Sequence, residues 1–147
     1  MERRQLILGS MATLAASASV GRLSSVIGSD TAFAVPGKTA NIDKIISSAT
    51  KCIETGLSCL TLCRKELAKG DKEMAECLRT VTDMLATSEA VQKLAANESP
   101  HLVAMAKICE KICQDCAKSC ERHAKHMAEC KACMDACKEL EKVCAAA

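Results

Sequence analysis

The sequence predicts an all-α protein, an antiparallel up-down-up-down four-helix bundle whose core is lined by cysteine. Most of the twelve cysteines are three, four or seven residues apart, which are the spacings that return to one face of a helix. Capping and breaking residues divide the chain into helix-length segments without alternating β-branched runs. Aromatic residues make up only 1% of the chain, so other side chains must fill its core.

Residues 1–34 have the pattern of a cleavable export signal. Arg3 and Arg4 precede a moderately apolar run, and an A-x-A cleavage sequence ends at Ala34. The adjacent arginines favour the twin-arginine route to the periplasm or cell envelope. The run is too short and too polar to span a membrane. We therefore expect residues 35–147 to form one bundle domain, with no stable membrane insertion once the signal is cleaved.

The first two helices are bounded by recognisable capping residues. The first is expected to begin near Asn41, a good N-cap residue, and to stop at Gly70. The second is expected to have Asp71 as its N-cap and to run to about Asn97.

The third helix has the clearest predicted start, with Ser99 as its cap and Pro100 in the first helical position. No Gly or Pro separates it from a fourth helix. However, the ten residues from Cys120 to Cys130 put these two thiols out of phase by about 80° at the helical advance. We therefore expect a turn near residues 123–127, which gives four helices joined by short connections.

The thiols divide by helical phase into three stripes and one isolated member. These are Cys52, Cys59 and Cys63; Cys109, Cys113, Cys116 and Cys120; Cys130, Cys133, Cys137 and Cys144; and Cys77 alone. Stacking the helices at about 1.5 Å per residue predicts three layers. The layer at one end holds Cys63, Cys77, Cys120, Cys130 and Cys133, the middle layer Cys59, Cys113, Cys116 and Cys137, and the far layer Cys52, Cys109 and Cys144. Contact between Cys63 and Cys120 is a direct consequence.

Such a concentration of thiols favours a soft metal ion: Cu(I), Zn(II) or an iron–sulfur cluster. Three four-thiolate zinc sites would bury a charge of about −6, whereas Cu(I) accepts two or three sulfurs and can match the thiolates nearly one for one. Cu(I) therefore leaves the core close to neutral, which burial favours. Two alternatives stay open. One is a disulfide-bonded or thiol-redox structural protein, and the other is a metallothionein-like protein that detoxifies zinc or cadmium.

Four CxxxC pairs each place two sulfurs one helical turn apart: Cys59 with Cys63, Cys109 with Cys113, Cys116 with Cys120, and Cys133 with Cys137. With these pairs and its scarcity of aromatics, residues 35–147 resemble the copper storage proteins, four-helix bundles with Cys-lined cores. The resemblance implies high-capacity binding of many Cu(I) ions by all twelve thiolates, without catalysis, and assembly as a homotetramer. The leader indicates the exported branch from methane-oxidising bacteria, which implies a copper acceptor in the envelope or membrane such as methane monooxygenase.

The family pattern also implies a metal entrance lined by Met and His. At one bundle end we expect Met74 and Cys77 to face His123 and Met127, because thioether and imidazole bind Cu(I) without releasing a thiol proton. His101 and Met105, at the opposite end, mark the competing entrance. The formal net charge of +2 comes without a basic face, which argues against a nucleic-acid partner.

Overall fold

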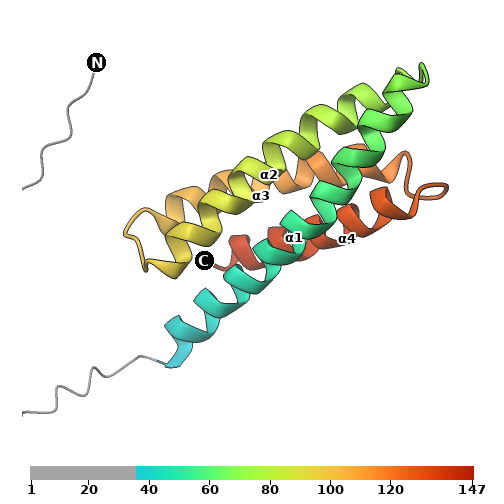
Figure 1. Cartoon of the computed structure of the whole chain (residues 1–147). Coiled ribbons are helices and arrows are strands. Elements are labelled where there is room, and N and C mark those ends of the chain that lie inside the picture. The colour runs from blue at the N-terminus through green and yellow to red at the C-terminus, as the bar shows by residue number, and fades with distance from the viewer. Residues whose placement is uncertain (1–35) are drawn as a thin grey trace, which may run out of the picture. The chain divides into compact units, whose positions relative to one another are not determined.

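The computed structural model describes residues 36–147, with side chains from residue 41 onward. This part of the chain folds into four α-helices and no β-strand: α1 (Pro36–Ala68), α2 (Met74–Ala96), α3 (Leu102–Glu121) and α4 (Ala128–Ala145). Successive helices run in opposite directions (Figure 1). The predicted antiparallel four-helix bundle is confirmed. The predicted export signal, residues 1–34, lies outside the described residues.

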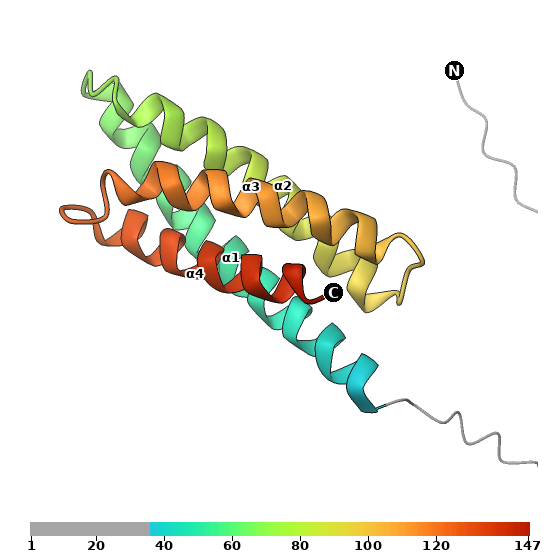
Figure 2. The same ribbon diagram turned by 180° about the vertical axis from the view of Figure 1, so that it is seen from behind.

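Each helix packs against its neighbours in sequence, and α1 packs against α4 to close the bundle. Two opposite views place the α1–α2 turn and the α3–α4 loop at the same end of the bundle (Figures 1 and 2). We call this end, formed by residues 69–73 and 122–127, the α1–α2 end. The other end, formed by residues 97–101 and the C-terminus, is the α2–α3 end.

Gly70 terminates α1 as predicted. Its φ of 98° lies in the left-handed region, which glycine adopts without steric cost. The amide of Gly70 donates to the carbonyl of Leu67 at 2.9 Å, and the amide of Asp71 donates to that of Glu66 at 3.1 Å. This pair of hydrogen bonds is the Schellman motif, which satisfies carbonyls left free at the helix end.

The start of α1 differs from the prediction. The helix begins at Pro36 rather than near Asn41. Proline is well suited to a first helical position, where its missing N–H has no partner to lose. The Asn41 side chain instead donates to the carbonyl of Ala146 at 3.3 Å and so ties α1 to the C-terminus.

The predicted N-caps of α2 and α3 are also wrong, each by two positions, because the N-cap residues are Glu73 and His101. The Asp71 carboxylate accepts from the amide of Glu73 at 3.1 Å, and the Ser99 hydroxyl accepts from the amide of His101 at 3.2 Å. Each side chain closes a short turn ahead of the helix. Pro100 lies in the second of these turns rather than in α3.

The predicted break between α3 and α4 is confirmed. The amides of His123 and Ala124 donate to the carbonyl of Cys120 at 3.0 and 2.9 Å, and the amide of Met127 donates to that of His123 at 3.0 Å. These bonds turn the chain without Gly or Pro. The phase of the thiols thus located a turn that no breaking residue marks.

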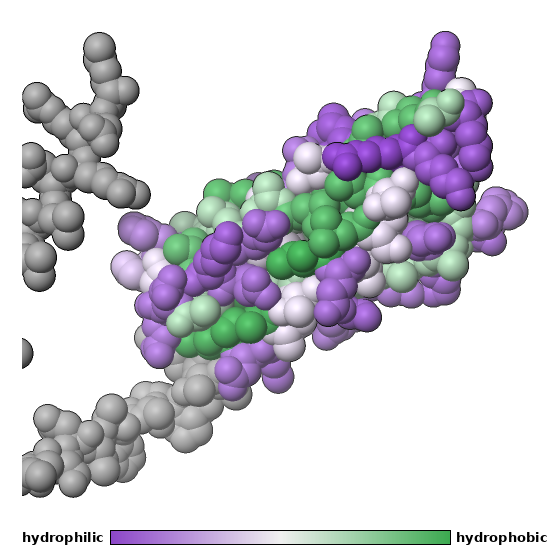
Figure 3. Space-filling model, in the orientation of Figure 1, coloured by the Kyte–Doolittle hydropathy of each residue, from purple (hydrophilic) through white to green (hydrophobic). Residues whose placement is uncertain are grey.

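On the face of the molecule seen in Figure 3, hydrophilic side chains surround apolar patches. The ion pairs lie on exposed helix faces, such as Arg79 with Glu76 at 2.8 Å and Lys131 with Asp135 at 2.6 Å. None of the helices in residues 36–147 is long and apolar enough to cross a membrane.

Candidate metal centre

All twelve cysteines are free, and all are buried. Eleven have an exposed fraction of 0%, and Cys144 has 3%. Helical phase explains this burial, since each stripe of thiols occupies the inward face of its helix. The core is therefore lined by sulfur along most of its length.

Cys59 on α1 lies at the centre of the largest group of sulfurs. Its Sγ atom is 3.8 Å from that of Cys77, 3.9 Å from those of Cys120 and Cys130, and 4.0 Å from that of Cys63. The sulfurs of Cys77 and Cys120 are 3.6 Å apart. We call these five residues the Cys59 cluster. All four helices contribute to it, at the α1–α2 end.

A second group continues the column toward the middle of the bundle. The sulfurs of Cys116 and Cys133 are 3.9 Å apart. Together with Cys137 they form a set whose sulfurs all lie within 4.8 Å of one another, and Cys133 also forms such a set with Cys59 and Cys120. Cys133 therefore connects the Cys59 cluster to the middle of the core.

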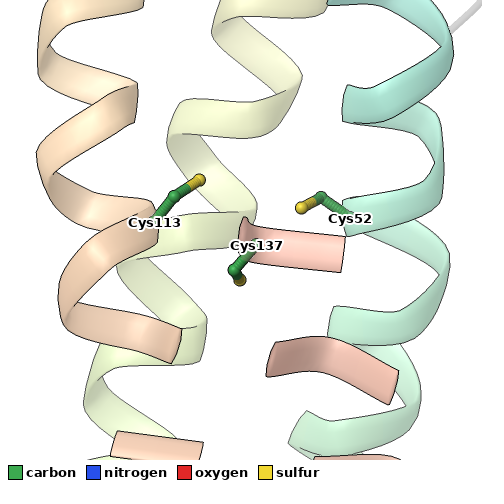
Figure 4. A group of neighbouring side chains, drawn as sticks. All are labelled: Cys52, Cys113 and Cys137. Atoms are coloured by element: carbon green, nitrogen blue, oxygen red, sulfur yellow. The ribbon is translucent and has the colours of Figure 1, made fainter. Parts of the chain in front are cut away.

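A third group joins Cys52, Cys113 and Cys137, whose sulfurs lie within 4.8 Å of one another. We call it the Cys52 triad. Its side chains come from α1, α3 and α4 and point toward a common space (Figure 4). Cys109 extends the column, with its sulfur 3.9 Å from that of Cys113. The Cys109 and Cys144 thiols perturb each other's pKa values, so Cys144 lies near this end of the column.

These contacts connect all twelve thiols into one column that runs the length of the core. The predicted layers are correct in outline but wrong for α1. Cys59, rather than Cys63, lies against Cys120, and Cys52 joins Cys113 instead of the far layer. The prediction stacked the helices from their expected ends at a uniform rise per residue. The observed register of α1 differs from it by about one turn, the four residues between Cys59 and Cys63.

Hydrogen bonds between neighbouring thiols separate their pKa values. Bonds from Cys113 and then Cys137 lower the pKa of Cys52 to about 5, despite burial. Bonds from Cys113 and then Cys144 lower the pKa of Cys109 to about 4. The thiols that supply these bonds retain their protons, so the pKa values of Cys113, Cys137 and Cys144 are raised.

The Cys59 cluster follows the same rule. The hydrogen bond between Cys63 and Cys59 lowers the pKa of Cys63. The hydrogen bond between Cys63 and Cys77, together with burial, raises this pKa more, to about 12. Bonds with Cys120 and its other neighbours lower the pKa of Cys77. Within each group, one or two sulfurs are prepared to act as thiolates, and the others must lose a proton when a metal binds.

The predicted entrance residues Met74, His123 and Met127 all lie at the α1–α2 end. Met74 is fully buried, while His123 and Met127 are half-buried, and Met127 packs against the core. The Nε2 atom of His123 is buried without a hydrogen-bond partner among the described residues. Glu76 near the start of α2 lines the same cleft as Arg122, so the α3–α4 loop lies beside α2.

The α2–α3 end is packed mainly by apolar side chains. Five residues near it are fully buried: Ile45, Ala49, Val91, Ala95 and Ala106. His101 is exposed and Met105 is half-buried. Sulfur also reaches this end, since Met105 lies one helical turn before Cys109, and Cys144 lies three residues before the end of the chain.

Sequence reasoning missed two polarisable side chains on the inner face of α2. Met84 and Ser88 are both fully buried, and the Ser88 hydroxyl donates to the Met84 Sδ atom at 3.3 Å. Met84 is not among the predicted metal ligands. Its position seven residues after Cys77 places it on the same stripe, and this signal could have identified it.

The fold and the site define a thiol-lined helical bundle able to hold soft metal ions. The family model for copper storage proteins matches residues 38–147. The chain belongs to the copper storage protein family. A comparison with curated protein sequences finds no match.

Solved structures with the same fold are similar to this chain at 22% sequence identity. One is a Cu(I)-bound copper storage protein, BsCsp3, with a TM-score of 0.66 over 72% of this chain and 96% of that protein. Another is a cytosolic copper storage protein from Streptomyces lividans with five coppers, with a TM-score of 0.69 over 76% of this chain and 94% of that protein. A third, from the same organism, is loaded with 10 copper equivalents, with a TM-score of 0.67 over 73% and 83% of the two chains.

The raised pKa values predict an alkaline loss of stability in the reduced, copper-free protein. Cys63 keeps its proton up to about pH 12 when folded, but only to the ordinary pKa of 9.0 when unfolded. Its stabilising contribution is complete below pH 9.0 and is lost as the pH rises toward 12. Thiols with lowered pKa values are ionised above pH 9.0 in both the folded and the unfolded protein, so they do not change the free energy of unfolding over this range.

We expect the free energy of unfolding, measured by urea denaturation, to fall above pH 9, by up to about 1.4 kcal/mol per pH unit for each such thiol. Cys63→Ala should make this fall less steep, by up to about the 1.4 kcal/mol per pH unit that one titrating thiol contributes. An unfolding free energy that stays constant or rises over this range would contradict the assignment.

Proposed function

We propose that this chain stores Cu(I), binding many ions through its twelve core thiolates and catalysing no reaction. The unbroken column of buried, free thiols is the observation that carries this proposal. Sulfur contacts of 3.6–4.0 Å let one ion lie between neighbouring thiols. Membership of the copper storage protein family supports the same role.

The grouping of the sulfurs favours Cu(I) over zinc or cadmium. The possible metal-binding groups each bring three thiols together, as in the Cys52 triad. Cu(I) accepts two or three sulfur ligands, whereas structural zinc sites are almost always tetrahedral. A singly charged ion also neutralises thiolates in a core that offers no buried cation among its residues.

The geometry also argues against a disulfide scaffold. Neighbouring sulfurs such as those of Cys59 and Cys63 are 4.0 Å apart, while a disulfide requires about 2.05 Å. Both thiols lie on the same regular helix, α1, where forming a disulfide bond between them would bend the backbone. The described residues also lack the βαβ unit in which thioredoxin-like CxxC motifs occur.

We place the entrance at the α1–α2 end, with Met74, His123 and Met127 as transit ligands. The unpartnered Nε2 atom of His123 supplies a lone pair or N–H that the protein leaves unused. The fully buried Met74 precedes Cys77 by one helical turn, and Cys77 belongs to the Cys59 cluster. An ion captured here can pass from sulfur to sulfur toward Cys52 and Cys144.

We propose that the chain is exported to the periplasm or envelope by the twin-arginine route, because of its paired arginines and A-x-A sequence. The domain of residues 35–147 would then supply copper to an acceptor enzyme in the envelope or membrane, such as methane monooxygenase. Thiolate sites hold Cu(I) tightly, so release requires a competing ligand or a partner.

We further propose that the domain assembles into a homotetramer. A second apolar stripe on α1, outside the thiol face, supports self-association. Its members are Ile46, Ile53, Leu57 and Leu60, and Leu57 is 53% exposed. Exposed apolar stripes of this kind commonly mark protein interfaces.

Anaerobic titration of the reduced domain with Cu(I) tests the storage proposal. We expect the number of ions bound, measured against a competing chromophoric chelator, to approach the twelve thiols. Zinc should compete poorly. Saturation at a single ion, or the absence of free thiols before reduction, would contradict storage.

Replacing both Met74 and Met127 by Leu tests the entrance. We expect slower Cu(I) uptake, followed by stopped-flow absorbance, and an unchanged final capacity, because the storage thiols remain. Met105→Leu, at the α2–α3 end, is the matched control and should leave the rate unchanged. An effect of the control but not of the double variant would place the entrance at the other end.

A further inference from the structure

The inner face of α2 changes character along its length. Cys77 is its single thiol, and the inward positions that follow are Val81, Met84, Ser88 and Val91. Met84 and Ser88 are both 0% exposed. A thioether and a hydroxyl thus lie on the side of the core where the Cys52 triad, built from the other three helices, has no thiol.

The thiol stripe of α1 has a gap at this level. Cys52 and Cys59 are seven residues apart, which is two helical turns or about 10.5 Å. The intervening buried residues are Thr55 and Gly56. The Thr55 hydroxyl donates to the carbonyl of Lys51 at 2.9 Å, so it is already occupied. On α1, no sulfur bridges the Cys59 cluster and the Cys52 triad.

Met84 reaches into this gap from α2. A Cβ atom placed on Gly56 would lie 2.5 Å from the Met84 Cε atom and 2.9 Å from the Leu85 Cδ2 atom. A side chain at this position would have to displace the flexible ends of Met84 and Leu85, and glycine accommodates their close approach without such a shift. Glycine inside a helix costs about 1 kcal/mol relative to alanine, so its presence here calls for a packing reason.

The thioether sulfur is held by a specific neighbour. The Ser88 hydroxyl donates to the Met84 Sδ atom at 3.3 Å. A thioether sulfur has two lone pairs, so Met84 can accept this hydrogen bond both with and without a metal bound to its second lone pair. The hydrogen-bonding capacity of this buried hydroxyl is satisfied in both states.

We propose that Met84 is an additional Cu(I) ligand, whose thioether replaces the thiol missing from α1 and links the Cys59 cluster to the Cys52 triad. A thioether is soft and neutral and has no proton to release. One Cu(I) ion bound by a single thiolate and Met84 is therefore charge-neutral. This inference rests on the proposed storage of Cu(I).

X-ray absorption at the selenium edge tests directly whether Met84 binds copper. The protein is labelled with selenomethionine in the Met74→Leu, Met127→Leu background, which removes the entrance methionines, and is then loaded with Cu(I). We expect a copper neighbour around selenium. Met84→Leu should abolish this neighbour, while Met134→Leu, at a half-buried position on α4, should retain it. Leucine nearly conserves the volume of methionine, and circular dichroism checks that the bundle is intact.

The outcomes separate this inference from the storage proposal. If the background protein binds many Cu(I) ions but selenium has no copper neighbour, or if the neighbour persists in Met84→Leu, then Met84 is only a core residue and storage still stands. If the protein binds no more than a single ion, the storage proposal fails, and this inference fails with it.

Discussion

The structure depends on one constraint, the helical phase of its cysteines. A thiol is smaller than a leucine or isoleucine side chain, so a core built from thiols forgoes much of the apolar volume that usually stabilises a bundle. It can be buried here because each stripe turns inward and neighbouring sulfurs exchange hydrogen bonds, as around Cys59. The conventional apolar packing is concentrated at the α2–α3 end, around Ile45 and Val91. The bundle thus combines an apolar base with a sulfur-lined column.

The two ends of the thiol column therefore differ in the side chains that surround them. One end has His123, whose Nε2 atom has no hydrogen-bond partner in residues 36–147, together with buried and half-buried methionines. The other end is packed mainly by aliphatic side chains, with Cys144 near the C-terminus. At the α1–α2 end, four thiols surround the sulfur of Cys59. The thiols deeper in the bundle form groups of three. Such an arrangement is suited to receiving soft ions at one end and retaining them along the interior.

Much of the fold could be predicted because phase is a local property of sequence. The turn before α4 was located from the slip between Cys120 and Cys130 alone, and Gly70 marked the end of α1. Register between helices depends on tilt and on the exact ends of the connections, which sequence spacing does not contain. The contact of Cys120 with Cys59 was therefore missed. Recognising Met84 required knowing that Gly56 lies opposite it, a relation between two helices.

The central claim is that the twelve buried thiols form one continuous set of Cu(I) ligands. Anomalous diffraction at the copper edge, from crystals of the Cu(I)-loaded domain, tests it most directly. We expect a row of copper peaks inside the bundle, in the Cys59 cluster and the Cys52 triad, each within bonding distance of two or three sulfurs. Copper bound only at the surface, with the core thiols unligated or joined in disulfides, would contradict it.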